Sequence, residues 1–559
     1  VVAANLNAIA KTANALRRVD VPPEWVELPD TPDDAPQSAV EAFMRPMLRQ
    51  QGDMLPVSAM DARGFAPLGT SRLEKRGIAR QIPQWRAKAC IQCGLCSLVC
   101  PHGCIRTFYP LAETALPADF HTVRAKGKAF SGRNFRVQVS PLDCTGCENC
   151  ARTCPAKEKA LVMRPAAEMA QEQANWNFAV SLPETAIGEA DTIPLAQAKT
   201  PLFEFSGACA GCGETPYIKL LTQLFGSHLM IANATGCSSI YAGSAPSCPY
   251  TVNQKGQGVA WGNSLFEDNA EFGFGMYLAM KHRRAHLAEQ VETLAAQCPE
   301  LAESCRAWLG SREDTALSAQ AGEALLAACE TLSHPLVKEI ADSADLLAAK
   351  SVWLIGGDGW AFDIGFGGLD HVLASGEKVR VLVLNTQVYS NTGGQASKAT
   401  PAGAAARLMS GGKSGAEKDL GLMAMTYGHV YVAQVAMGAN PNQLLKAMRE
   451  AEAWDGAALI IAYAPCIAHG IDMRDVQEIE KKAVQCGYFP LYRYHPANGL
   501  MLDSKAPDGD FQAFLMRQGR FAALRRSDPA KSETLCKMAE EAAQRRWNLL
   551  KMLKNREMP

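Results

Sequence analysis

Five short apolar runs in the second half of the chain alternate with segments of helical periodicity. The runs are Leu229–Ala232, Val352–Ile355, Val379–Leu384, Val430–Ala433 and Leu459–Ala462. They are continuously apolar rather than alternating, which is typical of strands buried on both faces of a parallel sheet. Helical periodicity over 417–427, 441–454 and 473–486 accompanies the last three runs. The pattern predicts a doubly wound α/β domain.

The flanks of this alternating region have different patterns. Asn5–Arg18 and residues 530–555 have helical spacing, and 285–345 is an Ala- and Leu-rich helical insertion between strands. Pro29–Pro36 is acidic and rich in proline, which predicts a loop on a surface. We expect the helix near the C-terminus to dock on another domain or subunit.

These patterns divide the chain into four parts. Residues 1–60 form a leading segment that completes an upstream domain, 61–165 form a cysteine-rich domain, 166–200 form an irregular linker, and 201–559 form the α/β domain with a C-terminal tail. A length of 559 residues favours several cores over one. Because the chain begins with Val rather than Met, we expect a fragment, a processed product or a natural subunit.

Composition narrows the class of protein. Hydrophobic residues make up 48% and charged residues 20%, as in soluble globular proteins. A net charge of −1 gives no support for a nucleic-acid or membrane-surface role. The sequence shows neither a spanning apolar stretch nor a signal peptide, and its 19 cysteines therefore indicate cytoplasmic thiols and metal clusters rather than disulfides.

Eight cysteines form two copies of one spacing. The copies are Cys90, Cys93, Cys96 and Cys100 before Pro101, and Cys144, Cys147, Cys150 and Cys154 before Pro155. In two-cluster ferredoxins the first three cysteines of each run wrap one cluster and the fourth reaches the other cluster. This assigns one 4Fe–4S cluster to Cys90, Cys93, Cys96 and Cys154, and a second to Cys144, Cys147, Cys150 and Cys100. Zinc sites are the alternative, but they favour two pairs of cysteines. Cys104 fits no ligand position and reads as a structural thiol.

Four further cysteines lie in loops or at strand ends on the expected ligand edge of the sheet. They are Cys209, Cys212, Cys237 and Cys466. Together they offer four thiolates for a third 4Fe–4S cluster, although Cys237 or Cys466 taken alone is more often a buried core thiol. The remaining cysteines keep that second interpretation.

Gly357-Asp358-Gly359 directly follows one of the apolar runs. Ligands of open α/β sheets bind beyond the carboxyl ends of the strands. The glycines allow a pyrophosphate to approach the backbone, and Asp358 offers the hard oxygen that Mg²⁺ prefers. Thr386, after the next run, is placed to complete the metal shell. A simple turn is the alternative interpretation of Gly-Asp-Gly.

Long sequence blocks resemble the pyruvate:ferredoxin (flavodoxin) oxidoreductase family of single-chain 2-oxoacid:ferredoxin oxidoreductases. The blocks are Cys209–Tyr217, Ala232–Ile240, Gln257–Asp268, Gly356–Trp360 and Val388–Gln395. The resemblance covers essentially the whole chain and implies a ferredoxin-like domain with two 4Fe–4S clusters ahead of a doubly wound domain that binds thiamine diphosphate. The family's chains are much longer, so this chain resembles their C-terminal part.

The resemblance also implies roles for individual residues. It places the third cluster, nearest the thiamine, on Cys209, Cys212, Cys237 and Cys466. It implies Mg²⁺ contacts from Asp358, Thr386 and the Val388 carbonyl. The cofactor would be lined by Glu214, Cys237, Gly357, Gly359, Trp360 and the run Thr386, Gln387, Val388, Tyr389, Ser390 and Asn391. Asn391 would lie near the reacting carbon as the catalytic residue.

By the same resemblance, the reaction is oxidative decarboxylation of pyruvate to acetyl-CoA and CO₂, with electrons passing through three clusters to ferredoxin or flavodoxin. The expected partners are the missing N-terminal domains or subunit, coenzyme A, pyruvate and a second copy in a homodimer. Two alternatives remain open at this stage: a sibling enzyme for another 2-oxoacid, and an electron-transfer subunit with a degenerate thiamine fold.

Overall fold

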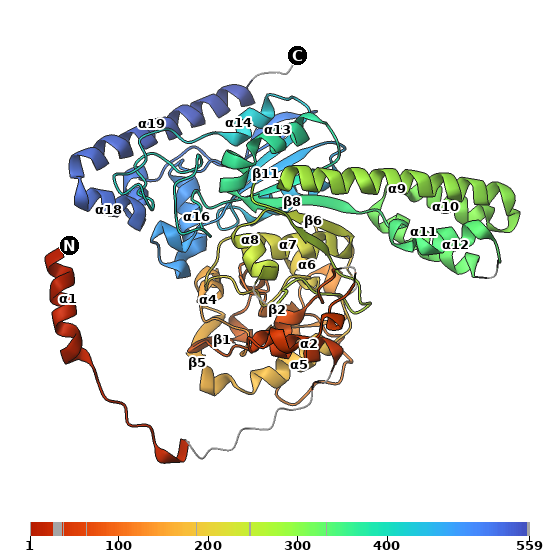
Figure 1. Ribbon diagram of the computed structural model, residues 1–559, viewed down its shortest axis with the longest axis horizontal. Coiled ribbons are helices and arrows are strands. Elements are labelled where there is room, and N and C mark those ends of the chain that lie inside the picture. The colour runs from red at the N-terminus through yellow and green to blue at the C-terminus, as the bar shows by residue number, and fades with distance from the viewer. Residues whose placement is uncertain are drawn as a thin grey trace.

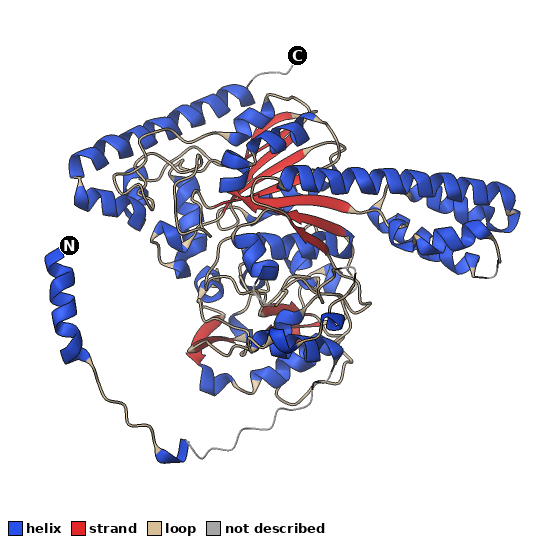
Figure 2. Ribbon diagram, in the orientation of Figure 1, coloured by secondary structure: helices blue, strands red, loops and turns tan. Residues whose placement is uncertain are grey.

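The molecule is built around one eight-stranded sheet with a smaller cysteine-rich region beside it (Figure 1). The computed structural model describes residues 2–25, 36, 38–62, 64–185, 187–244, 247–330 and 332–555. Apart from Pro36, the loop expected over Pro29–Pro36 lies outside the described residues. Strands of the large sheet cross the centre of the body, with helices on both sides (Figure 2).

The large sheet has the order β13-β12-β10-β11-β9-β8-β6-β7. Its strands are β6 (Leu229–Asn233), β7 (Ala260–Asn263), β8 (Ser351–Gly357), β9 (Arg380–Asn385), β10 (Tyr431–Val435), β11 (Ala458–Tyr463), β12 (Tyr492–His495) and β13 (Gly499–Leu502). All pairs from β10 to β7 are parallel, and β12 and β13 add an antiparallel edge. All five predicted strands are confirmed, and each observed boundary lies within two residues of the predicted one. The sequence pattern missed β7, β12 and β13.

The helices that surround this sheet have the following bounds. They are α7 (Thr215–Phe225), α8 (Cys237–Ser239), α9 (Asn269–Gln297), α10 (Ala302–Ser311), α11 (Thr315–Cys329), α12 (Pro335–Asp342), α13 (Phe366–Ala374), α14 (Leu420–Met425), α15 (Pro441–Ala453), α16 (Val476–Gln485), α17 (Phe511–Met516), α18 (Gly519–Ser527) and α19 (Pro529–Lys554). The helix expected over 417–427 is shorter in the structure, because Asp419 caps the start of α14. The helix expected from Met473 starts instead at Val476, after a short 3₁₀ turn.

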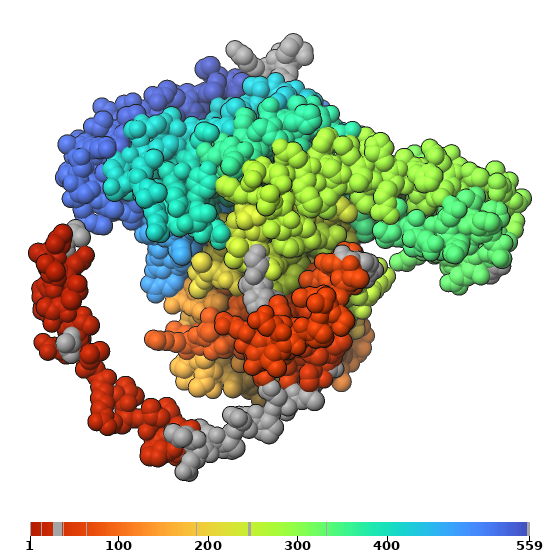
Figure 3. Space-filling view, viewed as in Figure 1, coloured from red at the N-terminus to blue at the C-terminus, as the bar shows by residue number. Residues whose placement is uncertain are grey.

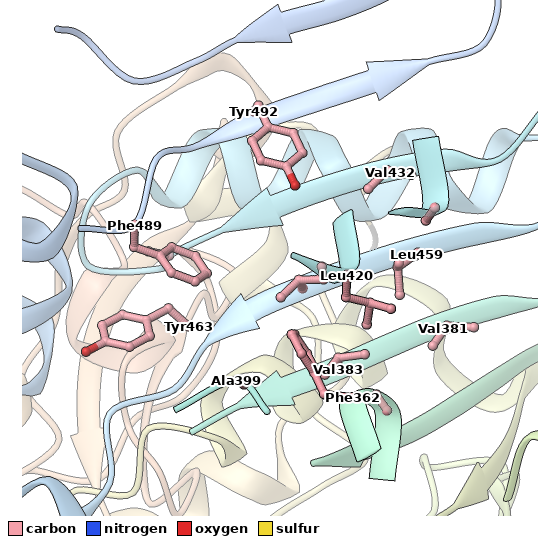
Figure 4. Packing of buried hydrophobic residues seen from close by; sticks show 14 of the residues in the cluster. Phe362, Val381, Val383, Ala399, Leu420, Val432, Leu459, Tyr463, Phe489 and Tyr492 are labelled. Atoms are coloured by element: carbon pink, nitrogen blue, oxygen red, sulfur yellow. The ribbon is translucent and has the colours of Figure 1, made fainter. Parts of the chain in front are cut away.

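Successive residues of each central strand enter two different cores. Val381, Val383 and Leu459 join one core, whereas Leu382 and Leu384 join the other. Figure 4 shows the first core, where side chains from β9, β10 and β11 lie together with residues of neighbouring helices and loops. This division explains the continuous apolar runs, because both faces of the sheet are covered.

The register of the sheet aligns the carboxyl ends of its central strands. Asn233 pairs with Ile355, Gly357 with Leu384, and Asn385 with Tyr463. The loops that follow β6, β8, β9 and β11 therefore leave the sheet along one edge. Those loops carry Cys237, Asp358, Thr386 and Cys466, which is the reason these side chains come together.

The cysteine-rich region, taken with the segment 166–200 that packs on it, contains two small sheets and four α-helices among its described residues. Its elements are β1 (Gln81–Trp85), β2 (Ile105–Phe108), β3 (Val123–Arg124), β4 (Asn134–Val139), β5 (Leu161–Pro165), α3 (Leu95–Leu98), α4 (Asn149–Thr153), α5 (Glu172–Ser181) and α6 (Ile193–Ala198). β1 pairs with β5, and β2-β4-β3 form the second sheet. Leu98 and Val99 enter the core on one face of the large sheet, so the two regions share packing.

The segment 166–200 was expected to be an irregular linker, and that expectation is wrong for much of its length. It contains α5 and α6, and Trp176 of α5 is buried in the cysteine-rich core. Ile193 and Ala196 of α6 pack in the core shared with the large sheet. The sparse apolar side chains of this segment are thus used in packing between regions rather than in a core of its own.

Helices α9 to α12 form an arm that extends from the body (Figure 3). The arm has its own apolar core, which includes Val291, Trp308 and Leu325. It corresponds to the predicted helical insertion, although α9 already begins at Asn269.

The C-terminal helix α19 packs on its own domain. Its buried face, including Ala539 and Leu550, belongs to the same core as β9 and β11. The expectation that the C-terminal helix docks on another domain or subunit is therefore wrong for its buried face. At the other end, α1 (Val2–Ala15) is exposed wherever its side chains are described, and α2 (Ala39–Leu48) buries only Met44.

Candidate functional site

The first three cysteines of the first run face the last cysteine of the second run. The loop before α3 carries Cys90 and Cys93, α3 carries Cys96, and Cys154 follows α4. Burial raises the pKa of Cys96, and repulsion from Cys93, Cys90 and Cys154 raises it further. The same neighbours, Cys90 and Cys154, act on Cys93. The structure therefore brings together the four thiols that the spacing assigns to one cluster.

The second group surrounds a small cavity of about 20 Å³. Its lining includes all four expected thiols, Cys100, Cys144, Cys147 and Cys150. The pKa of Cys147 is raised to about 12. Burial is the largest cause of this rise, and repulsion from Cys100 is the second. Each run thus sends its fourth cysteine to the other group, as in two-cluster ferredoxins.

Cys104 lies closer to this second group than the sequence suggested. Its Sγ is 3.6 Å from the Sγ of Cys100, and it lines the same cavity. The side chain is buried. It remains outside the set of four, but it contacts a member of that set.

The third set of cysteines gathers at the edge where the central strands end. Burial raises the pKa of Cys237, and repulsion from Glu214, Cys212 and Cys466 adds to it. Burial is also the main cause that raises the pKa of Cys466 to about 11, and repulsion from Cys209 contributes. The four cysteines therefore lie within electrostatic reach of one another, although they come from three separate loops.

Glycines allow these loops to approach closely. A Cβ on Gly213 would lie 2.5 Å from the carbonyl oxygen of Pro465, the residue before Cys466. A Cβ on Gly211 would lie 2.6 Å from the Met473 oxygen, and Gly211 has a φ of +80°. The glycine-rich sequence around Cys212 is therefore required to place it beside Cys466.

Asp358 is fully buried directly after β8 and is held from two sides. The backbone N–H and Oγ1 of Thr386 donate to its Oδ1 at 3.0 and 2.9 Å. The hydroxyl of Ser397 donates to Oδ2 at 2.6 Å. Burial raises the pKa of Asp358 to about 6, while the bonds from Ser397 and Thr386 oppose that rise.

Three oxygens thus converge from two adjacent strand ends. Thr386 Oγ1 lies 2.9 Å from both Asp358 Oδ1 and the carbonyl oxygen of Val388, and its single proton is shared between these two acceptors. Asp358, Thr386 and Val388 are the residues expected to ligate Mg²⁺, which takes oxygen ligands. A buried carboxylate with no cation beside it is costly, so a divalent ion fits this donor set.

The sequence interpretation missed the residues that hold this loop in place. Ser397 is one, since it bonds Asp358 directly. His469 is another, because its Nε2 lies 2.5 Å from the carbonyl oxygen of Thr386. Gln387 has a φ of +58°, and its Oε1 accepts from Tyr488 and Arg520 at 2.5 and 2.9 Å. A polar residue eleven positions after Thr386 gives no sequence signal of its own.

Cys237 connects the third cysteine set with the loop after β9. Its Sγ is 3.2 Å from Ser390 Oγ and 3.9 Å from Asn391 Oδ1. Asn391 is exposed and Ser390 is half-buried, so this part of the loop faces outward. The expected cluster nearest the cofactor and the expected cofactor loop are therefore direct neighbours.

Glu214 lies at the start of α7, within electrostatic reach of both Cys237 in the third cysteine set and Asp358. Its carboxylate accepts a hydrogen bond from the Tyr241 hydroxyl at 3.1 Å. Burial raises its pKa to about 7, the Tyr241 bond opposes this, and Asp358 raises it slightly. Glu214 therefore exchanges its proton near neutral pH.

The remaining expected cofactor residues lie around the turn after β8. Gly357 has no atom closer than 4.0 Å to the position of a Cβ, which leaves open space above the turn. Gly359 packs under the Tyr389 ring, where a Cβ would lie 2.7 Å from Cε1. Trp360 is fully buried in the core, and its Nε1 has no hydrogen-bond partner in the described structure. It supports the turn from beneath.

Within the described ranges, no three His, Cys, Asp or Glu side chains are grouped tightly enough to hold a single ion. A cluster has a different requirement, because each thiolate binds its own iron atom. The three sets of four buried or half-buried thiols, all free of disulfides, fit that requirement apart from the exposed Cys209. Burial raises the pKa of Cys96, Cys147 and Cys237, so these thiols would release protons when a cluster assembles.

Comparisons with known proteins agree with this geometry. Family models match at residues 26–79 (a domain of unknown function), 89–158 (a 4Fe-4S dicluster domain) and 340–462 (the C-terminal TPP binding domain of thiamine pyrophosphate enzymes). The chain is 51% identical to a pyruvate:ferredoxin oxidoreductase of Moorella thermoacetica, over 98% of this chain and 49% of that protein.

It is also 45% identical to a pyruvate-flavodoxin oxidoreductase of Klebsiella pneumoniae, over 98% of this chain and 48% of that protein. Over nearly its whole length the chain is similar to pyruvate:ferredoxin and pyruvate-flavodoxin oxidoreductases. It spans about half the length of these relatives. The predicted fold class, a 4Fe–4S domain followed by an α/β thiamine diphosphate domain, is confirmed. Among the described helices, none has the length and apolarity needed to cross a membrane.

Proposed function

We propose that this chain supplies the electron path and the Mg²⁺–pyrophosphate end of the cofactor site in an enzyme that oxidatively decarboxylates pyruvate to acetyl-CoA and CO₂. Ferredoxin or flavodoxin would accept the electrons. One observation carries the proposal: Cys237 of the third cysteine set lies 3.2 Å from Ser390 in the loop that also provides Thr386. A decarboxylase without redox chemistry has no need for thiols beside that loop.

Three 4Fe–4S clusters would connect this site to the surface. We assign the first to Cys90, Cys93, Cys96 and Cys154, the second to Cys100, Cys144, Cys147 and Cys150, and the third to Cys209, Cys212, Cys237 and Cys466. The third would receive electrons first, because its ligands adjoin the cofactor loop. The two ferredoxin-like clusters would pass them on, and such clusters can reach about −400 mV.

Thiamine diphosphate, when bound, supplies a carbon nucleophile and an electron sink for decarboxylation. Asp358, Thr386 and the Val388 carbonyl would hold its Mg²⁺, and Gly357 and Gly359 would let the pyrophosphate meet the backbone.

The loop residues Gln387, Tyr389 and Ser390 would line the cofactor, with Asn391 nearest the reacting centre. Glu214 would hold or release a proton between cofactor and cluster, since its pKa is about 7. Trp360 would act as a buried support of the turn after β8.

The division into parts at about 60, 165 and 200 is retained as a proposal, with 166–200 now a folded connection. Because the family members are about twice as long, we propose that further domains or a further subunit complete the site and bind pyruvate and coenzyme A. We also propose a cytoplasmic homodimer. An electron-transfer subunit with a degenerate thiamine fold is disfavoured, because the Asp358–Thr386–Val388 arrangement is intact.

The test compares residues 1–559 alone with the same chain joined to the remaining domains, in cis or in trans. We expect the complete enzyme to reduce a viologen dye only with both pyruvate and coenzyme A, and residues 1–559 alone to be inactive. Activity with 2-oxoglutarate but not pyruvate would refute the substrate assignment. Robust turnover by residues 1–559 alone would refute the division of the cofactor site and make Glu214 the first candidate for the activating acid.

A further inference from the structure

A fully buried lysine connects the thiamine domain to the ferredoxin-like clusters. Lys219 lies in the second turn of α7, the helix that follows Cys212, and its exposed fraction is 1%. Its Nζ donates to the carbonyl oxygen of Ser97, on α3 between Cys96 and Cys100. The ammonium group therefore lies at α3, between Cys96 and Cys100, which are assigned to different ferredoxin-like clusters.

The surroundings fix this position. The Lys219 stem packs beside Gly103, where a Cβ would lie 3.5 Å from Lys219 Cδ. Gln197 of α6 bridges the two helices, because its Oε1 lies 3.4 Å from Lys219 Nζ and accepts from Ser97 Oγ at 2.8 Å. Its Nε2 donates to Gln223 of α7 at 3.0 Å. Lys219 is therefore held in a polar network across the boundary between the two regions.

Lys219 forms no ion pair with a carboxylate of the described residues. The nearby Glu204 carboxylate is instead paired with Arg106 and Arg72. The groups that would favour protonated Lys219, once ionised, are Cys100, Cys96 and Cys104, and Arg106 opposes them. A buried ammonium is costly unless negative charge compensates it.

Cluster ligation would provide that compensation. Each 4Fe–4S cluster with its thiolates is negatively charged and gains one more negative charge on reduction. Net charge and hydrogen bonding near the sulfurs set cluster potentials. Burial lowers the pKa of Lys219 to about 8, which still leaves it charged at neutral pH.

We propose that Lys219 is a fixed cation that favours reduction of the clusters held by Cys96 and Cys100, and so draws electrons from the third cysteine set into the ferredoxin-like domain. In this step one electron leaves the third cluster and enters a ferredoxin-like cluster. No bond forms or breaks, and Lys219 keeps its proton. The inference rests on the proposed function, because it requires the proposed clusters.

The test is a redox titration, followed by EPR, of the complete enzyme prepared without oxygen. Lys219→Met keeps most of the stem and removes the charge. We expect the equilibrium constant for one-electron reduction of at least one ferredoxin-like cluster to fall tenfold or more. This corresponds to a reduction potential about 59 mV more negative. The control Lys446→Met removes a charge from an exposed side chain of α15, and its potentials should match the wild type.

A second variant tests the same inference if Lys219→Met does not fold. Gln197→Glu preserves Lys219, is nearly isosteric, and places a carboxylate beside the ammonium, so it should also make the potential more negative. Full iron content with unshifted potentials in either variant overturns the inference. Absence of ferredoxin-like signals from the wild type itself would instead refute the proposed clusters, and this inference with them.

Discussion

Replacing Asp358 with Asn should stabilise the cofactor-free protein while abolishing its metal-dependent cofactor binding. Asp358 is fully buried, and burial raises its pKa from 3.8 to about 6. A carboxyl whose folded-state pKa lies above its unfolded value holds its proton more tightly in the folded state. Ionised Asp358 therefore destabilises the fold: the cost is absent below pH 3.8, grows up to about pH 6, and is complete above that pH.

The magnitude follows from the size of the pKa shift. About two units at 1.36 kcal/mol each give a cost of about 3 kcal/mol at pH 7.5. Asn keeps an acceptor for Thr386, and its amide can donate to Ser397, but the exchange of hydrogen bonds costs about 1 kcal/mol. We expect Asp358→Asn to increase the free energy of unfolding by about 2 kcal/mol at pH 7.5. The gain should disappear near pH 4, where Asp358 is protonated in the folded state and the small remaining ionisation cost no longer exceeds the ~1 kcal/mol lost in the exchange of hydrogen bonds.

Urea unfolding of the cofactor-free protein at the two pH values measures the stability change. Calorimetric titration with thiamine diphosphate and Mg²⁺ measures binding. Asp363→Asn is the matched control, because Asp363 lies in the turn after Asp358 but bonds the backbone N–H of Lys398 instead. Asp363→Asn should retain cofactor binding. Unchanged affinity in Asp358→Asn, or an equal stability gain at both pH values, would refute the reasoning.

Two further substitutions test the supports of the site. Gly213→Ala should prevent assembly of the third cluster, because the new Cβ would lie 2.5 Å from the Pro465 oxygen. Iron analysis measures this loss. Gly275→Ala is the control, because nothing lies within 4 Å of the position of its Cβ. Iron content unchanged by Gly213→Ala would show that the loop can shift. Ser397→Ala should weaken Mg²⁺-dependent cofactor affinity by roughly 10–100-fold, since Ser397 orients Asp358. Calorimetry measures this affinity, and a wild-type value would mean that Thr386 alone orients the carboxylate.

Much of the fold could be predicted from local sequence pattern. The central strands were visible because both faces of each strand are buried, which leaves an uninterrupted apolar run. β12 and β13 lie at the edge of the sheet, where such runs are not required, and the pattern missed them. The segment 166–200 was misjudged because α5 and α6 use few apolar residues, each packed against another region of the chain.

The candidate site was predictable where chemistry imposes a spacing. Cysteine runs and Gly-Asp-Gly have such spacings, and the structure groups their side chains accordingly. Ser397, His469 and Lys219 have none, because they reach the site from loops or helices that only tertiary packing brings near. Trp360 is fully buried beneath the turn after β8, and its place in the cofactor lining stays a prediction.

The central claim is that this chain carries three 4Fe–4S clusters, one of them beside the cofactor loop. Iron and sulfide analysis with EPR, on anaerobically prepared protein, tests it most directly. The account predicts about twelve irons per chain, and about eight in Cys466→Ser with the ferredoxin-like signals intact. Cys486→Ser, a buried thiol outside the three sets, should leave the count unchanged. A wild-type count near eight that Cys466→Ser does not alter would contradict the account.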